Sequence, residues 1–274
     1  MPEGDTIFRA ARTLHRALAG KAVIAFESVL PALTRIDEDA PIAGRTIDRV
    51  TAAGKHLLIH FSGDLVLRTH MRMNGSWHIY RTGERWQRAR RDMRIVIRTS
   101  DLEAVGFSIP VAEFMSNAEL TRHPDLRRLG PDLLSDTFDA EQAVTNLRRR
   151  PASAIADALL NQQVIAGLGN VYKSEILFMC RVNPFALVGD LPDRQLAALV
   201  ETGRQVLRTN VSENLASMTT YGGLRRTTGR SDPSGRLWVY GRARLPCRRC
   251  GTRIGVRKHG LDARLTYWCP SCQP

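Results

Sequence analysis

Apolar residues near the start of the chain recur at intervals of three or four positions. This spacing predicts an amphipathic helix over residues 5–19, with Asp5 as its N-cap and Gly20 as its end. The residues on its apolar face are Ile7, Ala10, Ala11, Leu14, Ala17 and Leu18.

Shorter apolar runs, separated by turn residues, follow this helix. Residues 56–61 and 65–70 flank Ser62-Gly63-Asp64, which predicts a β-hairpin, and residues 76–80 and 94–98 form two further predicted strands. Several short strands with turn signals between them favour an antiparallel sandwich or barrel.

Near residue 117 the pattern changes, and helical spacing begins at about residue 139. The predicted helices cover residues 141–149, 152–163, 171–180 and 193–215. A stretch at 221–235 rich in Gly, Arg, Thr and Ser predicts a mobile loop. We therefore expect an α+β multidomain protein. Its parts are an N-terminal antiparallel β-sandwich with a leading helix (1–117), a linker (118–135), a helical domain (136–235) and a cysteine-rich module (236–274).

The chain of 274 residues is strongly basic. It has 40 Lys and Arg against 27 Asp and Glu, a formal charge of +13, and residues 221–274 contain 12 basic and 2 acidic side chains. This surplus predicts a polyanionic partner, nucleic acid first and an anionic membrane surface second. No apolar run reaches the 18 or so residues of a membrane span, and residues 1–5 do not resemble a signal peptide. We expect a soluble, cytoplasmic protein.

The basic residues are mostly arginine. Only four are lysine, namely Lys21, Lys55, Lys173 and Lys258. Codon usage in a GC-rich genome explains the bias, and each lysine stands out against it.

Four of the five cysteines occur as two C-x2-C pairs separated by 18 residues. They are Cys247, Cys250, Cys269 and Cys272. This spacing predicts one structural Zn²⁺ held by four thiolates. Two disulfides are the alternative, which is disfavoured in a chain without a secretion signal.

Two further segments suggest chemistry. Ala166-Gly167-Leu168-Gly169-Asn170 predicts two helices joined by a tight turn, with Asn170 capping the second helix. Its free N–H groups suit phosphate, although a helix connection in an ordinary core is an equal alternative. At the start, removal of Met1 would expose the amine of Pro2, a nucleophile able to form a Schiff base beside the carboxyl group of Glu3.

The order of these motifs resembles one known family. Pro2-Glu3-Gly4, Gly-Lys-His-Leu-Leu at 54–58, Ala-Gly-Leu-Gly-Asn at 166–170 and the four-cysteine module ending Tyr-Trp-Cys-Pro-Ser-Cys-Gln at 267–273 occur in sequence. The chain resembles the formamidopyrimidine-DNA glycosylase and endonuclease VIII family of base-excision repair over essentially its whole length. The resemblance implies a β-sandwich, a helix–two-turn–helix domain and a zinc finger.

The resemblance also implies roles for single residues. Pro2 would attack C1′ of a damaged nucleotide, and Glu3 would be the general acid for base loss. Lys55 would contact phosphate and donate a proton in β-elimination, and Arg264 would grip phosphate in δ-elimination. The implied DNA contacts are Arg128, Asn170 and a wedge loop of Arg72, Met73 and Asn74 that fills the space left by a flipped base.

The chain departs from the family pattern at two places. Asp5-Thr6 replaces a second glutamate near Glu3, and residues 103–108 lack the Arg-Phe pair with which formamidopyrimidine glycosylases hold the orphaned base. The second departure favours the endonuclease VIII branch and oxidised pyrimidines, whereas a long loop at 219–235 could act as a lid over a purine.

We therefore expect a monomeric bifunctional DNA glycosylase and abasic-site lyase acting on damaged double-stranded DNA, without an organic cofactor. The alternatives are a non-catalytic zinc-finger DNA-binding protein on the same scaffold and a basic RNA- or ribosome-associated zinc protein.

Overall fold

The computed structural model describes residues 2–212, 225–228, 230, 232, 235–260 and 262–274. Two units emerge from the contacts within the chain: one ends at Arg127, and the other begins at Arg128 and contains the C-terminal module. Most of the predicted loop at 221–235, the proposed lid and the end of the predicted helix 193–215 lie outside the described residues.

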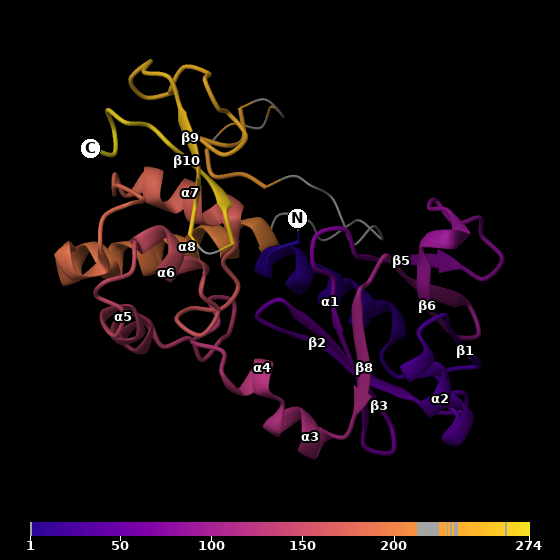
Figure 1. Ribbon diagram of the computed structural model, residues 1–274. Coiled ribbons are helices and arrows are strands. Elements are labelled where there is room, and N and C mark those ends of the chain that lie inside the picture. The colour runs from indigo at the N-terminus through magenta and orange to yellow at the C-terminus, as the bar shows by residue number, and fades with distance from the viewer. Residues whose placement is uncertain (1, 213–224, 229, 231, 233–234, 261) are drawn as a thin grey trace. The chain divides into compact units, whose positions relative to one another are not determined.

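The first unit is built around a leading helix and two four-stranded antiparallel sheets, with shorter helices beside them (Figure 1). One sheet has the order β2-β3-β4-β8, with β2 at Ile47–Ala53, β3 at His56–Phe61, β4 at Leu65–His70 and β8 at Val111–Met115. The other has the order β1-β6-β7-β5, with β1 at Ala25–Ser28, β6 at Met93–Arg98, β7 at Leu102–Phe107 and β5 at Ser76–Arg81.

One main apolar core joins these elements. It combines residues of helix α1 (Gly4–Leu18) with inward-facing residues of both sheets, such as Ile59 on β3 and Trp77 on β5. The rings of Phe26 on β1 and Phe114 on β8 lie 5.5 Å apart, so the sheets also meet away from the helix. The predicted antiparallel sandwich is confirmed.

The predicted elements of this unit are present. Helix 5–19 corresponds to α1, and residues 56–61 and 65–70 pair as a hairpin whose turn contains Gly63 and Asp64 at positive φ. Asp5 is not the N-cap, because the helix begins one residue earlier and Glu3 holds that position. The prediction missed β1, β2, β7, β8 and helix α2 (Pro31–Asp39).

Two short helices, α3 (Asn117–Arg122) and α4 (Pro124–Arg127), lie in the stretch that the sequence indicated as a linker. Their residues Leu120 and Leu126 pack on Leu58, Val66 and Met115, on the outer face of the β2-β3-β4-β8 sheet. Beside this patch the buried guanidinium of Arg68 pairs with the carboxylates of Glu113 and Asp125. The two helices are thus fastened to the sheet by apolar packing and by ion pairs.

The second unit contains four main helices around its own apolar core. They are α5 (Ala140–Arg148), α6 (Ile155–Leu160), α7 (Asn170–Met179) and α8 (Asp193–Ser212). Short 3-10 turns occupy Arg90–Asp92 in the first unit and Val188–Asp190 in the second. In the part of the chain that the structure describes, no helix is long and apolar enough to cross a membrane.

Helix α6 is shorter than predicted, and its connection to α7 is longer. The helix ends at Leu160 because side-chain amides take over backbone groups: Gln162 donates to the carbonyls of Leu160 and Leu168 and accepts from Gly167 N–H. The expected tight turn is therefore a structured nine-residue connection over 161–169.

The C-terminal module is a two-stranded hairpin, β9 (Gly255–His259) and β10 (Arg264–Trp268), flanked by the two C-x2-C pairs. Its buried Cys247, Ile254 and Cys269 form one apolar cluster with Phe178 of helix α7. The module is therefore packed on the helical part of its unit.

Candidate DNA-binding and catalytic site

Pro2 and Glu3 lie at the N-terminal end of α1, and both are buried. The carbonyl oxygen of Glu3 accepts the N–H groups of Thr6 and Ile7 at 2.9 and 3.1 Å. The helix dipole places partial positive charge at this end, which lowers the pKa of a nearby amine and favours a carboxylate. An amine at Pro2 would therefore have an acid beside it and a reduced tendency to bind a proton.

Asp5, where the family pattern has a second glutamate nearby, faces inward. Its carboxylate is fully buried, lies 3.5 Å from the guanidinium of Arg9 and accepts the hydroxyl of Thr6 at 3.3 Å. The departure thus places a paired carboxylate within the first helical turn.

Lys55 occupies the two-residue turn between β2 and β3, next to Gly54 at φ +57°. Helix α1 runs antiparallel to β2, because Gly20 N–H donates to Ile47 O and Val50 N–H donates to Nδ1 of His15. From His15 back to Glu3 the helix rises about 18 Å, and from Val50 to the turn the strand advances about 17 Å. The register therefore directs the Lys55 turn toward the buried N-terminus.

Two histidines lie beside this turn. The rings of His56 and His70 meet edge to face at 4.8 Å. Burial, aided by the charge of Arg68, lowers the pKa of His56 to about 3. Burial, aided by Arg72 and Lys55, lowers the pKa of His70 to about 4. Both imidazoles are neutral at physiological pH. Because Nδ1 of His70 accepts the N–H of Arg72 at 3.0 Å, the proton of this neutral ring is on Nε2.

The predicted wedge residues form the connection between β4 and β5. Arg72, Met73 and Asn74 are all exposed, and Met73 exposes 55% of its surface. An exposed thioether side chain at a loop tip suits insertion between base pairs.

Asn170 and Arg264 are brought together in the second unit. The side-chain amide of Asn170 donates to the carbonyl of Leu265 at 2.8 Å, immediately after Arg264. Asn170 is the first residue of α7 and Gly169 is its N-cap, so the predicted capping role is wrong. The Nδ2 of Asn170 donates to the hairpin, and its buried Oδ1 accepts no hydrogen bond from the described residues. Arg264 is partly exposed, with Asp262 at 3.6 Å.

Lys173 was not anticipated as part of this arrangement. Its side chain is almost completely buried, and Nζ donates to the hydroxyl of Thr266 at 2.7 Å. The scarcity of lysine was the available sequence signal.

Glu175 was also missed. Its buried carboxylate accepts the backbone N–H groups of residues 238–240 at 2.7–2.8 Å, which ties α7 to the segment that leads into the cysteine-rich module, the finger.

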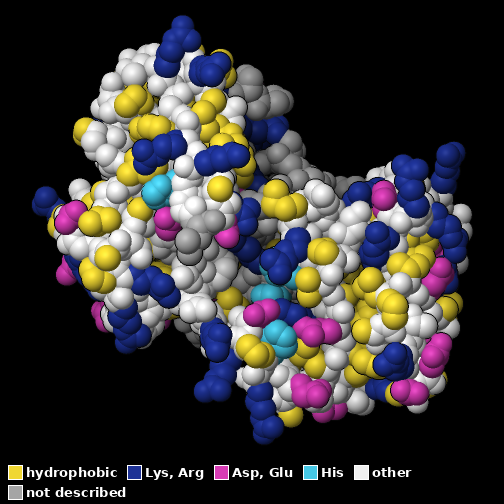
Figure 2. Space-filling view, viewed as in Figure 1, with side chains coloured by type: hydrophobic (Ala, Val, Ile, Leu, Met, Phe, Trp, Pro, Cys, Tyr) yellow, Lys and Arg dark blue, Asp and Glu magenta, His cyan; other side chains and the backbone are white. Residues whose placement is uncertain are grey.

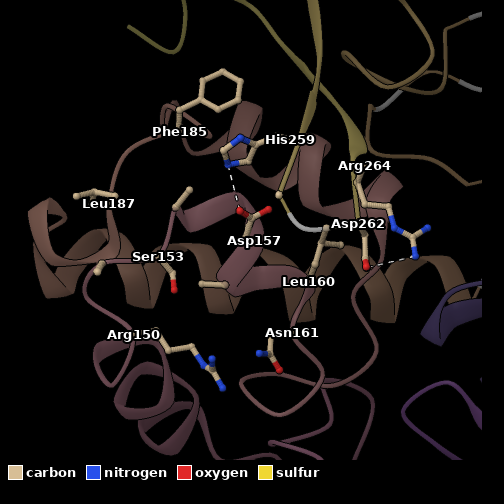
Figure 3. A pocket seen from close by; sticks show the side chains of 14 residues that line it. Arg150, Ser153, Asp157, Leu160, Asn161, Phe185, Leu187, His259, Asp262 and Arg264 are labelled. Atoms are coloured by element: carbon tan, nitrogen blue, oxygen red, sulfur yellow. Dashed lines mark ion pairs between the residues drawn. The ribbon is translucent and has the colours of Figure 1, made fainter.

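A cavity of about 730 Å³ lies between α6 and the hairpin, beside Arg264 (Figure 3). On its wall Asp157 pairs with Nε2 of His259 at 3.1 Å. A Cβ added to Gly260, which has φ +74°, would lie 2.4 Å from the Asp157 carboxylate. The hairpin that carries Arg264 is thus held against α6 on one side and α7 on the other.

The four cysteines of the predicted zinc site converge, with all four Sγ atoms within 4.8 Å of one another. Two close pairs join different C-x2-C motifs, Cys250 to Cys269 at 3.4 Å and Cys247 to Cys272 at 4.0 Å, and none of the four is in a disulfide. A tetrahedron with Zn–S bonds of about 2.3 Å has S–S edges of about 3.8 Å. These residues could therefore hold one zinc ion, which would crosslink the two ends of the hairpin.

Arg128 is exposed and lies one residue beyond α4. Lys and Arg side chains are spread over the face shown in Figure 2. Pro2, Glu3, Lys55 and the wedge loop thus belong to the first unit, and Asn170, Arg264 and the cysteines to the second.

Comparisons with known proteins agree with this description. Residues 1–131 match the formamidopyrimidine-DNA glycosylase N-terminal domain family, and residues 129–221 match the formamidopyrimidine-DNA glycosylase H2TH domain family. The "Probable endonuclease 8 2" of Streptomyces coelicolor is 41% identical over 100% of this chain and 94% of its own length. The "DNA-(apurinic or apyrimidinic site) lyase Nei2" of Mycolicibacterium smegmatis is 38% identical, and "Endonuclease 8" of Escherichia coli K12 is 33% identical, both over 99% or more of each chain.

A solved complex of Lactococcus lactis Fpg with abasic-site DNA shares the fold, with a TM-score of 0.83 and 23% identity over 100% of both chains. The chain therefore belongs to the formamidopyrimidine-DNA glycosylase and endonuclease VIII family. Its full-length relatives named endonuclease 8 place it in the endonuclease VIII branch.

Proposed function

We infer that the protein is a DNA glycosylase and abasic-site lyase of base-excision repair, and we propose that the amine of Pro2 is its nucleophile. The observation that carries the proposal is the buried Pro2-Glu3 pair at the positive end of α1, toward which the Lys55 turn is directed. A zinc-finger DNA-binding protein without catalysis would not need this arrangement.

The proposed reaction uses the side chains in sequence. The Pro2 amine attacks C1′, the glycosidic bond breaks and the base leaves, while Glu3 protonates the sugar oxygen as the ring opens. The resulting Schiff base acidifies the C2′ proton, whose loss expels the 3′ phosphate, and a second elimination expels the 5′ phosphate. In this scheme Lys55 holds phosphate and donates a proton in the β-elimination, and Arg264 grips phosphate in the δ-elimination.

Borohydride reduction in the presence of abasic-site DNA tests the proposal. Reduction converts a Schiff base into a stable covalent bond, so the protein should become attached to the DNA. A protein that binds this DNA but is never trapped would instead be the non-catalytic binding protein.

We further propose that one zinc ion is held by the four cysteines, and that the protein works as a cytoplasmic monomer, associated with the nucleoid when bound to DNA.

DNA binding should depend strongly on salt, because the contacts proposed for Lys55, Arg128, Asn170 and Arg264 are all to phosphate. About 0.9 counterion is released per phosphate neutralised by a cationic side chain, so Lys55, Arg128 and Arg264 give a log–log slope of roughly −3, to which the neutral Asn170 adds nothing. Asn170→Ala should weaken binding to every sequence alike. Titrations at several salt concentrations measure both effects, and a slope near zero would contradict the phosphate contacts.

Oxidised pyrimidines should be better substrates than 8-oxoguanine paired with cytosine. Phe107 is fully buried in β7, so it is not available to stack on an orphaned base, and residues 103–108 offer no arginine beside it in sequence. One stacking or bidentate contact contributes about 1–3 kcal/mol, or roughly 5- to 150-fold in selectivity. Single-turnover cleavage of matched duplexes with one lesion each measures the preference. Equal or faster release of 8-oxoguanine would contradict it.

A further inference from the structure

The wedge loop, residues 71–75, is a tight turn that presents one apolar side chain to solvent. Met71 is buried at its base, and Met73 is exposed at its tip. The N–H of Gly75 donates to Met71 O at 2.9 Å, and Arg72 has φ +48°. A Cβ on Gly75 would lie only 2.6 Å from Met71 O, so the turn closes too tightly for another residue there.

An arginine from a different loop supports this turn. Arg88 lies between β5 and β6, and its Nη1 donates to the hydroxyl of Ser76 at 3.1 Å and toward the carbonyl of Asn74 at 3.4 Å. Its Nη2 donates toward the hydroxyl of Ser108, just after β7, at 3.4 Å. One guanidinium thus joins the end of the wedge loop to the end of a core strand.

The guanidinium is itself held in place. It stacks on the ring of Phe107, 5.6 Å from the ring centroid, and lies 3.7 Å from the carboxylate of Asp92. Phe107 is fully buried, so the surface under the arginine is rigid. A planar guanidinium can satisfy several acceptors in one fixed geometry, which the ammonium of a lysine cannot do.

We propose that Arg88 is a positioning residue for the wedge loop, and that it fixes Met73 in the direction needed to enter the DNA stack. The proposal rests on the proposed function, because a wedge is useful only to a protein that extrudes a nucleotide. When Met73 enters the DNA, the stacked bases push the wedge loop back toward the protein. A wedge loop without a supporting contact would be displaced before the base pairs separate. The bonds from Arg88 to Ser76 and Asn74 oppose that movement at the point where the loop rejoins the sheet.

Arg88→Ala tests the brace, with Arg85→Ala as the matched control. Arg85 is an exposed arginine in the same loop for which no hydrogen bond or ion pair is present among the described residues. The probe is a duplex that carries 2-aminopurine opposite a tetrahydrofuran abasic-site analogue. The fluorescence of 2-aminopurine rises when it is no longer stacked on its neighbouring bases. We expect Arg88→Ala to lose most of this rise and to slow single-turnover excision from duplex by about 10- to 100-fold. Its affinity for undamaged duplex and its Tm should match those of Arg85→Ala.

Three further variants decide the mechanism: Met73→Ala, the double variant with Arg88→Ala, and Arg88→Lys. If Arg88 acts through Met73, adding Arg88→Ala to Met73→Ala should slow excision little further. If the two residues act independently, their separate fold-reductions in rate should multiply. Arg88→Lys keeps the charge but not the fork, so it should behave like Arg88→Ala. A parent-like Lys variant, multiplying effects or equal loss of binding to undamaged duplex would each overturn the proposal.

The fluorescence experiment needs no catalysis, so its outcome is separate from that of the proposed function. A parent protein that is never trapped by borohydride contradicts the function. A parent that is trapped, with Arg88→Ala giving the full fluorescence rise, contradicts the role of Arg88 alone.

Discussion

Pro2→Gly should slow base excision from intact lesions by about 100-fold or more. Glycine leaves a primary amine on a freer backbone, and misplacement of a reacting group by about 1 Å can cost 100-fold in rate. The buried position of Pro2 at the start of α1 holds the native amine in one place. Single-turnover excision of thymine glycol from duplex, with borohydride trapping in parallel, measures the loss.

Two controls separate the nucleophile from its surroundings. A protein with an uncleaved N-terminal extension, which has no amine at Pro2, should fail both in excision and in trapping. Glu3→Gln should lose excision of an intact base but still be trapped on DNA that already contains an abasic site. Parent-like excision by the extended protein would move the nucleophile elsewhere, with Lys55 the first candidate.

Cys247→Ser should abolish the proposed zinc binding and weaken DNA binding by about 10- to 100-fold. The Sγ of Cys247 lies 4.0 Å from that of Cys272 in the four-cysteine cluster, and Cys269 follows directly on β10, the strand that begins with Arg264. Without the metal the hairpin loses the crosslink between its ends, and a module of roughly 35 residues has too small a core to replace it.

Cys180→Ser is the matched control for this experiment. Cys180 is the one cysteine outside the cluster, and its Sγ lies 3.4 Å from the hydroxyl of Thr202, so serine can occupy the same place. Metal analysis of the pure proteins should give about one zinc per chain for the parent and for Cys180→Ser. Less than about half an equivalent in the parent would argue against the four-thiolate site.

The sequence predicted those helices, turns and motifs whose residues lie close together along the chain. The helical spacing of residues 5–19, the turn at Gly63-Asp64 and the spacing of the cysteines each carry their own signal. Strands β2 and β7 carry little, because polar residues such as Asp48 and Glu103 interrupt them and their pairing with distant strands supplies the stability.

Sequence motifs carry the predicted site residues, whose roles stay predictions, whereas contacts that only folding creates leave no signal in the sequence. Pro2, Lys55 and Asn170 stand in recognisable motifs. Arg88 is one of 36 arginines, and only the folded chain shows that it lies against Phe107 and the wedge loop. Likewise the neutral state of His56 depends on burial and on the charge of Arg68, which pairing of β3 with β4 brings near.

The attachment of the finger to α7 affects how the protein can be divided. Phe178 shares an apolar cluster with Cys247 and Cys269. The buried side chains of Lys173 and Glu175 form hydrogen bonds with the C-terminal segment. Truncation before the finger would expose that apolar surface to water and remove those partners of both side chains. The finger therefore cannot be exchanged between proteins on its own. Recombination could transfer it only together with helix α7, on which it packs.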